Sequence, residues 1–285
     1  MTDALAQSPS GPNDWAADVG ARWLAHIDVF EAQIADIGDA LFERSAFAPG
    51  ERVIDVGCGG GATTIRIAEA VGPQGSATGL DISPALIAEA GRRAGTLGIA
   101  NAAFACADAA AAMPEGAPFD RLSSRFGSMF FPDPRAAFAN LHAMLRPGGR
   151  IDLAVWAEAP ENPWMSASMA IIGKHLDLPS RDPRSPGPFA FADLLYLRDI
   201  LADAGFSAPD VAAWHGLLPI GGRTASPAQA AQHIATATGA SDLLRGVDPA
   251  TRARIVADMT AEFARHQTPN GVLAPGKVWL VTSFA

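Results

Sequence analysis

The residues best suited to ligand chemistry stand together in one short segment, Arg52–Ala62, which reads RVIDVGCGGGA. Its residues Val53–Val56 predict a short, mostly apolar strand, and the glycines from Gly57 onward predict a tight turn into a helix. Such a turn brings the unpaired N–H groups of the helix start close to a ligand. The carboxylate of Asp55 would repel a phosphate there but suits an ammonium group.

Different interpretations of this loop imply different ligands. Gly57, Gly59 and Ala62 satisfy the G-x-G-x-x-G/A fingerprint of dinucleotide-binding folds, in which the loop holds a pyrophosphate. S-adenosylmethionine has no phosphate and carries an amino-acid end and a sulfonium, and Asp55 favours this ligand. A structural strand–turn–helix without any ligand is the third interpretation.

Further acids close the next two predicted strands. Asp81 follows the strand 76–80, and Asp108 follows the strand 102–107. Parallel strands end at one edge of a sheet, so both carboxylates are expected beside the glycine loop. Asp81 could accept both hydroxyls of a ribose, as it also would in an NAD site. Asp108 could accept from the amino group of adenine, although either acid could instead cap a helix or a turn.

Strands and helices alternate from residue 51 to Trp156, which predicts a parallel, doubly wound sheet. After Trp156 the alternation stops, and we interpret residues 220–270 as a helical cap inserted between the last two strands. The expected fold class is α/β, a doubly wound Rossmann-like seven-stranded mostly parallel sheet with helical cap additions. The other predicted elements are strands at 119–123, 150–156, 211–218 and 276–283, and helical regions at 165–176, 192–204 and 226–265.

The region before the sheet shows strong helical periodicity. Apolar residues recur at steps of three and four from Trp15 to Leu41, which predicts a helix with one apolar face and a break near Gly38 or Gly20. The indoles of this region either pack in the core or form a lid over the cofactor or substrate. Residues 1–13 are polar and predict a flexible tail.

Several segments together resemble class I S-adenosylmethionine-dependent methyltransferases, in particular the ubiquinone/menaquinone-biosynthesis-like branch of small-molecule enzymes. The resemblance is dense over residues 50–157 and looser beyond them, and the fourth strand, with Arg121, is less apolar than is usual in the family. It implies S-adenosyl-L-methionine as cofactor and S-adenosyl-L-homocysteine as product. The segments are VIDVGCGGG (53–61), GLDIS (79–83), ADA (107–109), FD (119–120), SRFG (124–127), FFPDP (130–134) and LRPGG (145–149).

The resemblance also implies roles for particular residues and parts of the chain. The implied parts are an N-terminal helical cap (1–47), an S-adenosylmethionine-binding core (48–157) and a completion of the sheet with an inserted cap and substrate region (158–285). The implied cofactor contacts are Asp55, Gly57, Cys58 and Gly59 at the methionine end, Asp81 and Ile82 at the ribose and one adenine face, Asp108 and Ala109 at the adenine edge, and Ser124 and Arg125 beside the methionine amine and the transferring methyl.

The implied activity is methyl transfer to a small organic acceptor by in-line displacement. Alignment of nucleophile, methyl and sulfur is the main task of such a protein, and a base is needed only if the nucleophile must lose a proton. The sequence identifies no catalytic residue and does not distinguish O-, N- and C-methylation. Because they follow a strand at the edge that borders the site, Trp156, Glu158 and Asn162 are expected substrate contacts.

The sequence speaks against two other functions and leaves a third one open. A short-chain NAD-dependent oxidoreductase needs a Tyr-x-x-x-Lys pair, but the one tyrosine, Tyr196, is followed by isoleucine at position 200. An arsenite-type methyltransferase needs several thiols, and the chain has only Cys58 and Cys106. A non-catalytic S-adenosylmethionine-binding or regulatory protein stays open, because binding motifs do not establish turnover.

Composition narrows the class of protein further. A hydrophobic share of 49% with 18% charged residues over 285 residues is enough for a full core. The net charge of −9 without a basic run speaks against a nucleic-acid partner, and the two cysteines cannot form a zinc site of their own. We expect Cys106 to be a small buried hydrophobe. Without an apolar signal or membrane-spanning stretch, a cytoplasmic monomer or homodimer is expected.

Overall fold

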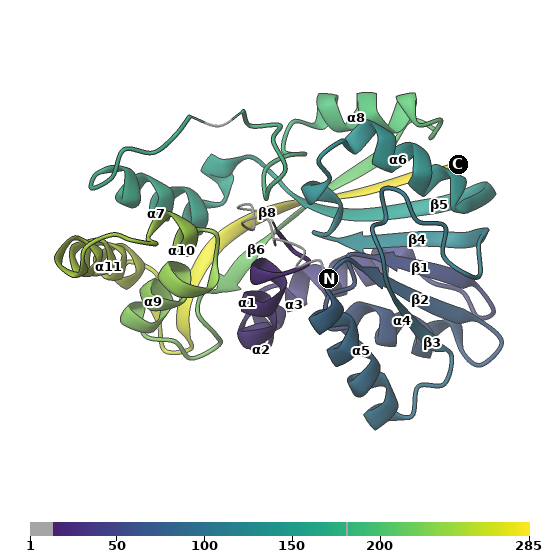
Figure 1. The fold of residues 1–285 in the computed structure, drawn as a ribbon, viewed down its shortest axis with the longest axis horizontal. Coiled ribbons are helices and arrows are strands. Elements are labelled where there is room, and N and C mark those ends of the chain that lie inside the picture. Colours follow the sequence, from purple (N-terminus) through teal and green to yellow (C-terminus); the bar gives the residue numbers. More distant parts are fainter. Residues whose placement is uncertain (1–13, 181) are drawn as a thin grey trace, which may run out of the picture.

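The computed structural model describes residues 14–180 and 182–285, so the tail predicted over 1–13 lies outside the described residues. Seven strands of the described part follow the order β3-β2-β1-β4-β5-β8-β6, and the short β7 pairs with β8 (Figure 1). β8 runs antiparallel to β5 and β6, whereas the pairs from β3 to β5 are parallel. The predicted doubly wound, mostly parallel sheet is confirmed. The strands are β1 (Arg52–Val56), β2 (Ser76–Asp81), β3 (Ala102–Cys106), β4 (Phe119–Arg125), β5 (Leu145–Trp156), β6 (Asp210–Pro219), β7 (Gln267–Thr268) and β8 (Gly271–Phe284).

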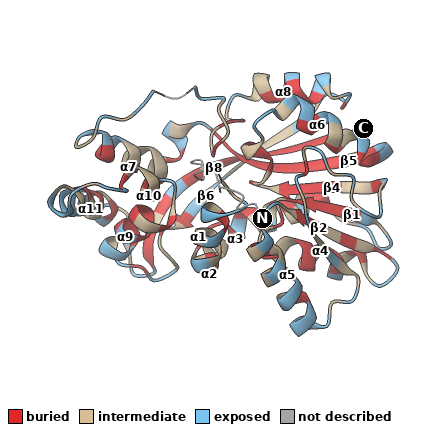
Figure 2. Cartoon of the chain, in the orientation of Figure 1, coloured by how far each residue is buried: buried red, intermediate tan, exposed pale blue. Residues whose placement is uncertain are grey.

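Helices cover both faces of the sheet because β1 is apolar on both sides. Val53 packs in a cluster with Ile67 of α4, whereas the next residue, Ile54, belongs to the larger core that includes Phe138 of α6. The strands accordingly form the most buried layer of the molecule (Figure 2). The helices are α1 (Asp18–Ala25), α2 (Ile27–Gln33), α3 (Ala35–Ser45), α4 (Ala62–Val71), α5 (Pro84–Leu97), α6 (Pro134–Ala143), α7 (Pro163–Gly173), α8 (Leu194–Asp203), α9 (Pro227–Ala237), α10 (Ala240–Leu243) and α11 (Pro249–Ala264), with 3-10 turns η1 (Ser128–Phe130) and η2 (Ala159–Glu161).

Helices α9, α10 and α11 lie in the chain between β6 and β8, and we call them the cap. Together with α7 they gather at the end of the molecule to which the long strands β6 and β8 extend (Figure 1). The division of the chain at residues 47/48 and 157/158 stays a prediction. Within the described ranges, none of the helices is both long and apolar enough to cross a bilayer.

The N-terminal region forms three short helices, and the prediction of where it breaks is wrong. The breaks fall at His26 and Ile34, whereas Gly20 and Gly38 lie inside α1 and α3. Gly20 serves close packing, because a Cβ on it would lie 2.3 Å from the carbonyl oxygen of Trp15. A glycine inside a helical pattern therefore marks a close approach here and not a helix end.

The prediction that Cys106 is buried is also wrong. Cys106 ends β3, which is the edge strand of the sheet and has a neighbour on one side only, and its side chain is exposed. Its Sγ lies 3.6 Å from the carbonyl oxygen of Ile82. Cys58, in contrast, is buried in the glycine loop, and burial raises the pKa of its thiol well above the ordinary value.

Candidate functional site

The glycine loop between β1 and α4 is held in place by the end of β2. The N–H groups of Gly57 and Cys58 both donate to the carbonyl oxygen of Leu80, at 2.8 and 3.2 Å. Gly57 has φ +70°, and a Cβ there would lie 2.6 Å from Cα of Gly127, in the loop after β4. The two loops therefore touch backbone to backbone, which only glycine permits at this position.

Asp81 ties the end of β2 to the same loop. One carboxylate oxygen accepts from the N–H of Gly59 and the other from the N–H of Ser83, each at 2.9 Å. Burial raises the pKa of Asp81 above its ordinary value, although these hydrogen bonds oppose the shift. Beside it, the apolar side chain of Ile82 is 41% exposed, which leaves an open surface for a flat ring.

The predicted adenine-edge residues follow β3, the neighbour of β2. The sheet register pairs Asp81 with Cys106, so the segment after β3 begins beside the end of β2. Asp108 is exposed, and one of its carboxylate oxygens accepts from the N–H of Ala110 at 2.8 Å. Ala109 is buried. Asp108 thus caps a turn, as the alternative interpretation proposed, while its second oxygen has no partner among the described residues.

Asp55 and Arg125 place opposite charges beside the glycine loop. Asp55 is 1% exposed and accepts a hydrogen bond of 2.7 Å from the Thr64 hydroxyl of α4. Burial raises the pKa of Asp55 to about 6, and the Thr64 hydrogen bond and the positive charge of Arg125 oppose this shift. Burial also lowers the pKa of the Arg125 guanidinium, against the attraction of Asp55. Arg125 forms neither a hydrogen bond nor an ion pair with any described residue.

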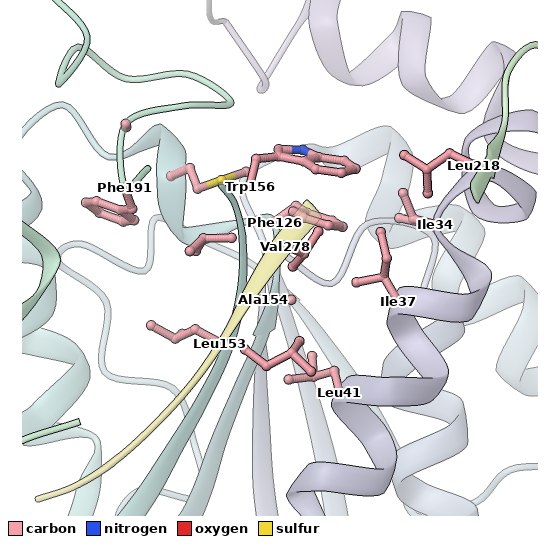
Figure 3. Packing of buried hydrophobic residues seen from close by; sticks show 14 of the residues in the cluster. Ile34, Ile37, Leu41, Phe126, Leu153, Ala154, Trp156, Phe191, Leu218 and Val278 are labelled. Carbon is pink, nitrogen blue, oxygen red and sulfur yellow. The ribbon is translucent and has the colours of Figure 1, made fainter. Parts of the chain in front are cut away.

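The backbone after Arg125 is strained. Phe126 has φ +65°, which is uncommon for a bulky residue, and such strain gathers at functional sites. Its N–H donates to the carbonyl oxygen of Ala154 at 3.0 Å. Its ring stacks on Trp156 with centroids 4.4 Å apart and an interplanar angle of 12° (Figure 3). These contacts fix the turn that brings Gly127 against the glycine loop.

Ser124 and Cys58 are both buried beside the glycine loop. The hydroxyl of Ser124 donates to the carbonyl oxygen of Val56 at 2.8 Å and accepts from the N–H of Ser128 at 3.2 Å. Ser124 therefore locks the end of β1 to the loop after β4. Cys58 is 8% exposed, so its thiol is enclosed by the residues around the loop.

The N-terminal helices cover the glycine loop, and this is the part of the site that the sequence defined least. A Cβ on Gly60 would lie 2.3 Å from Cδ1 of Ile27, and one on Gly59 would lie 3.9 Å from Nε1 of Trp23. Trp23 was expected either to pack in the core or to form a lid, whereas Ile27 and Thr64 were not predicted as site residues. Their only signal in the sequence was helical periodicity, which does not say what a helix packs against.

The three expected substrate contacts end in different environments. Trp156 is 6% exposed and lies between Phe126 and Trp164, directly after β5. Glu158 is exposed. The amide of Asn162 is fully buried, donates to the carbonyl oxygens of Ala157, Glu158 and Lys277, and accepts from the N–H of Lys277. Asn162 therefore joins the segment after β5 to β8. Trp156 is the one of the three whose side chain packs against the ring of Phe126 beside the glycine loop.

A doubly wound sheet, a glycine loop at the carboxyl edge of its strands and acids at the ends of β1 and β2 form the arrangement that the resemblance to class I S-adenosylmethionine-dependent methyltransferases implied. Residues 53–149 match the family described as a methyltransferase domain. Residues 53–149 therefore carry a methyltransferase domain, as the motifs predicted.

The chain is 37% identical over 115 residues to aklanonic acid methyltransferase DauC of a Streptomyces strain, which covers 40% of this chain and 52% of that protein. It is 29% identical over 168 residues to a demethylmenaquinone methyltransferase of Staphylococcus epidermidis, with 55% and 68% covered. A solved putative methyltransferase from Bacillus halodurans shares the fold with a TM-score of 0.57 and 17% identity, over 87% of this chain and 98% of that one. The chain spans about half the length of the first of these relatives.

Proposed function

We propose that this protein transfers a methyl group from S-adenosylmethionine to a small organic acceptor. The observation that carries the proposal is that Asp55 and Arg125 bring opposite charges to the glycine loop without forming an ion pair with each other. An amino-acid end has an ammonium and a carboxylate, and this site offers a carboxylate and an unpaired guanidinium. A pyrophosphate would meet the negative charge of Asp55, which speaks against the NAD alternative.

We propose contacts for each part of the cofactor, from its methionine end through the ribose to the adenine. The carboxylate of the methionine end pairs with Arg125, and the ribose hydroxyls bind Asp81, which already faces the loop through Gly59. The adenine lies on the exposed side chain of Ile82, with Asp108 at its amino group. The remaining proposed contacts are Gly57, Cys58, Gly59 and Ser124 around the methionine end and Ala109 at the adenine edge.

When bound, the cofactor supplies an electrophilic methyl group on a sulfonium. The task left to this chain is to align the acceptor with that methyl and to exclude water. The stacked rings of Phe126 and Trp156 offer an apolar wall for a small organic acceptor. We propose Trp156 as an acceptor contact, and we assign no general base.

Two measurements test the proposed function. Calorimetry should show binding of S-adenosylmethionine and S-adenosylhomocysteine but not of NAD. Incubation with S-adenosylmethionine and a metabolite extract should give a methylated product in mass spectrometry. Cofactor binding without any product across acceptor classes would favour the non-catalytic binder, and binding of NAD in place of S-adenosylmethionine would overturn the proposal.

We also propose that the protein acts in the cytoplasm as a monomer or homodimer. The free, exposed thiol of Cys106 supports a reducing compartment. Light scattering of the purified chain would give its oligomeric state, and fractionation of cells that express it would test its location.

A further inference from the structure

A cavity of about 390 Å³ lies between α2 and the cap. Its walls are His26 and Val29 on the α2 side, the loop 221–225 after β6, and one side of α9. Ile27, the first residue of α2, packs instead against Gly60 of the glycine loop. Helix α2 therefore separates this cavity from the loop of the proposed cofactor site.

The charges around the cavity favour an anion. None of the residues that line it is acidic, although the chain as a whole carries a net charge of −9. Arg223 is exposed at its rim, and its guanidinium has neither a hydrogen bond nor an ion pair with the described residues. A cationic group in a concave wall without carboxylates attracts and orients an anionic ligand.

His233 of α9 adds a buried aromatic ring to the wall. Its side chain is 7% exposed, and its Nε2 has no hydrogen-bond partner. The ring packs against Phe30 at 5.0 Å and against His26 at 5.7 Å between ring centroids. Burial and the neighbouring His26 lower the pKa of His233 to about 4, so the imidazole is neutral at pH 7. The ring therefore offers an uncharged, largely apolar contact for the body of a ligand.

We propose that this cavity binds a small organic carboxylate, whose carboxylate pairs with Arg223 and whose body lies against Val29 and His233. The volume fits this class, because it lies within the range of small-molecule sites and is far too small for a macromolecule. The site is separate from the proposed cofactor site, so the inference does not depend on the proposed function.

The test uses benzoate as the probe, with benzamide as its neutral analogue and inorganic phosphate as a second anion. Imidazole NMR signals of His26 and His233 in the full chain should shift on titration with benzoate. Benzoate should bind at least tenfold more tightly than benzamide. The variant Arg223→Gln should weaken benzoate at least tenfold, whereas Arg265→Gln, an exposed arginine beside Glu262 on the same cap, should change nothing.

A second variant removes space instead of charge. Gln232 is exposed on the cavity side of α9, and Gln232→Trp should abolish benzoate binding while circular dichroism stays unchanged. The proposal is overturned if Arg223→Gln binds benzoate as well as the wild type, or if benzamide binds equally. Phosphate binding without benzoate binding would overturn the organic class, and displacement of benzoate by S-adenosylhomocysteine would assign the cavity to the cofactor site.

Discussion

Strand β4 carries two arginines that differ in their partners: one side chain is hydrogen-bonded within the protein, and the other is not. Arg121 and Arg125 are four residues apart, so their side chains point to the same face of the sheet, where α3 crosses both. The carbonyl oxygen of Ser45, at the C-terminal end of α3, accepts from Arg121 at 2.6 Å. Gly38, in the first half of α3, lies against the guanidinium of Arg125, which has no partner among the described residues.

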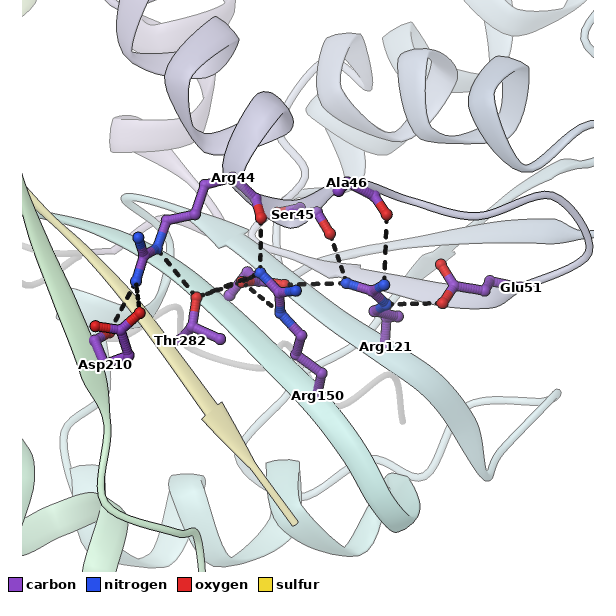
Figure 4. Close-up of polar contacts among 9 residues, drawn as sticks. Arg44, Ser45, Ala46, Glu51, Arg121, Arg150, Asp210 and Thr282 are labelled. Carbon is purple, nitrogen blue, oxygen red and sulfur yellow. Dashed lines mark hydrogen bonds and ion pairs between the residues drawn. The ribbon is translucent and has the colours of Figure 1, made fainter.

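Around Arg121 the charges form a closed network (Figure 4). Arg150 lies with Nε and Nη2 at 3.0 and 2.7 Å from one oxygen of the buried Asp152, and the hydroxyl of Thr282 donates to that oxygen at 2.7 Å. The other oxygen of Asp152 lies 3.7 Å from Arg121. Nη2 of Arg150 also donates to the carbonyl oxygen of Arg44 at 2.8 Å.

The two regions differ in whether their arginines have partners within the protein. A buried ion keeps its charge at a high desolvation cost, which partners in the protein normally offset. Arg121 and Arg150 have such partners and join α3 to the sheet. Arg125 has none, and its lowered pKa reflects that burial. This difference supports our proposal that Arg125 contacts the cofactor.

The largest effect is expected from breaking the paired region. Arg150→Met should lower the free energy of unfolding by about 3 kcal/mol, because it leaves the carboxylate of Asp152 buried with only a distant cation. Urea denaturation would measure this loss. Arg146→Met on the same strand removes an exposed ion pair with Asp120 and should cost less than about 1 kcal/mol. Equal losses in both variants would contradict the network's role.

The next effect concerns the pH dependence that Asp55 imposes. In the unfolded chain this carboxyl ionises near 3.8, and in the folded protein near 6. Well below pH 3.8 it is protonated in both states and carries no penalty. As pH rises towards 6, the folded protein binds the proton more tightly, and the wild type loses stability relative to Asp55→Asn. At about 1.4 kcal/mol for each pH unit between the two values, the loss reaches up to about 3 kcal/mol.

Urea denaturation of the wild type and Asp55→Asn from pH 4.5 to 7.5 would measure this difference. The asparagine keeps an oxygen for the Thr64 hydroxyl, so the fold should persist. The exposed site Asp108 supplies the control variant Asp108→Asn. If the stability of Asp55→Asn ran parallel to that of the wild type across this range, the carboxyl would not carry the strain that its burial implies.

Arg125→Met should act on the ligand and not on the fold. Loss of a charge-assisted hydrogen bond to the methionine carboxylate should weaken S-adenosylhomocysteine by about 10- to 100-fold. The free energy of unfolding should stay equal or rise, because an unpaired charge leaves a half-buried position. Calorimetry and urea denaturation on the same preparations would separate the two effects, with Arg150→Met as the opposite case. Unchanged affinity would remove Arg125 from the cofactor site.

The sequence was sufficient to place those residues whose positions follow from the order of strands, turns and helices along the chain. Strand, glycine turn and helix follow one another at Asp55 and Gly57, and Asp81 ends the next strand, so their common edge follows from the topology of parallel strands. The pattern did not show that Asp81 binds the loop itself through Gly59, because that contact depends on how closely two turns approach.

The remaining errors concern contacts between segments that are distant in the chain. Cys106 looked buried by its apolar neighbours, but β3 is an edge strand, which only the strand order reveals. Asn162 looked like a substrate contact, but it binds the backbone of Lys277, 115 positions away in the chain. Gly38 looked like a helix break, whereas it makes room for Arg125. Periodicity and motifs describe one segment at a time and cannot supply such pairs.

Gly38→Ala tests that last pair with the smallest expected effect. Alanine normally stabilises a helix interior by up to about 1 kcal/mol over glycine. At Gly38 the new Cβ would lie 2.5 Å from Nη1 of Arg125, so the guanidinium must move. Because that group is the flexible end of a side chain, the fold should tolerate the change, but S-adenosylhomocysteine should bind a few-fold more weakly as Arg125 leaves its position.

The matched control is Gly95→Ala in α5, where a Cβ would have no neighbour within 4 Å. It should raise the free energy of unfolding by up to about 1 kcal/mol and leave affinity unchanged. Calorimetry and urea denaturation of both variants give the comparison. If Gly38→Ala gained as much stability as Gly95→Ala and kept full affinity, then α3 would not set the position of Arg125. The contrast between the two arginines of β4 would then arise from the glycine loop alone.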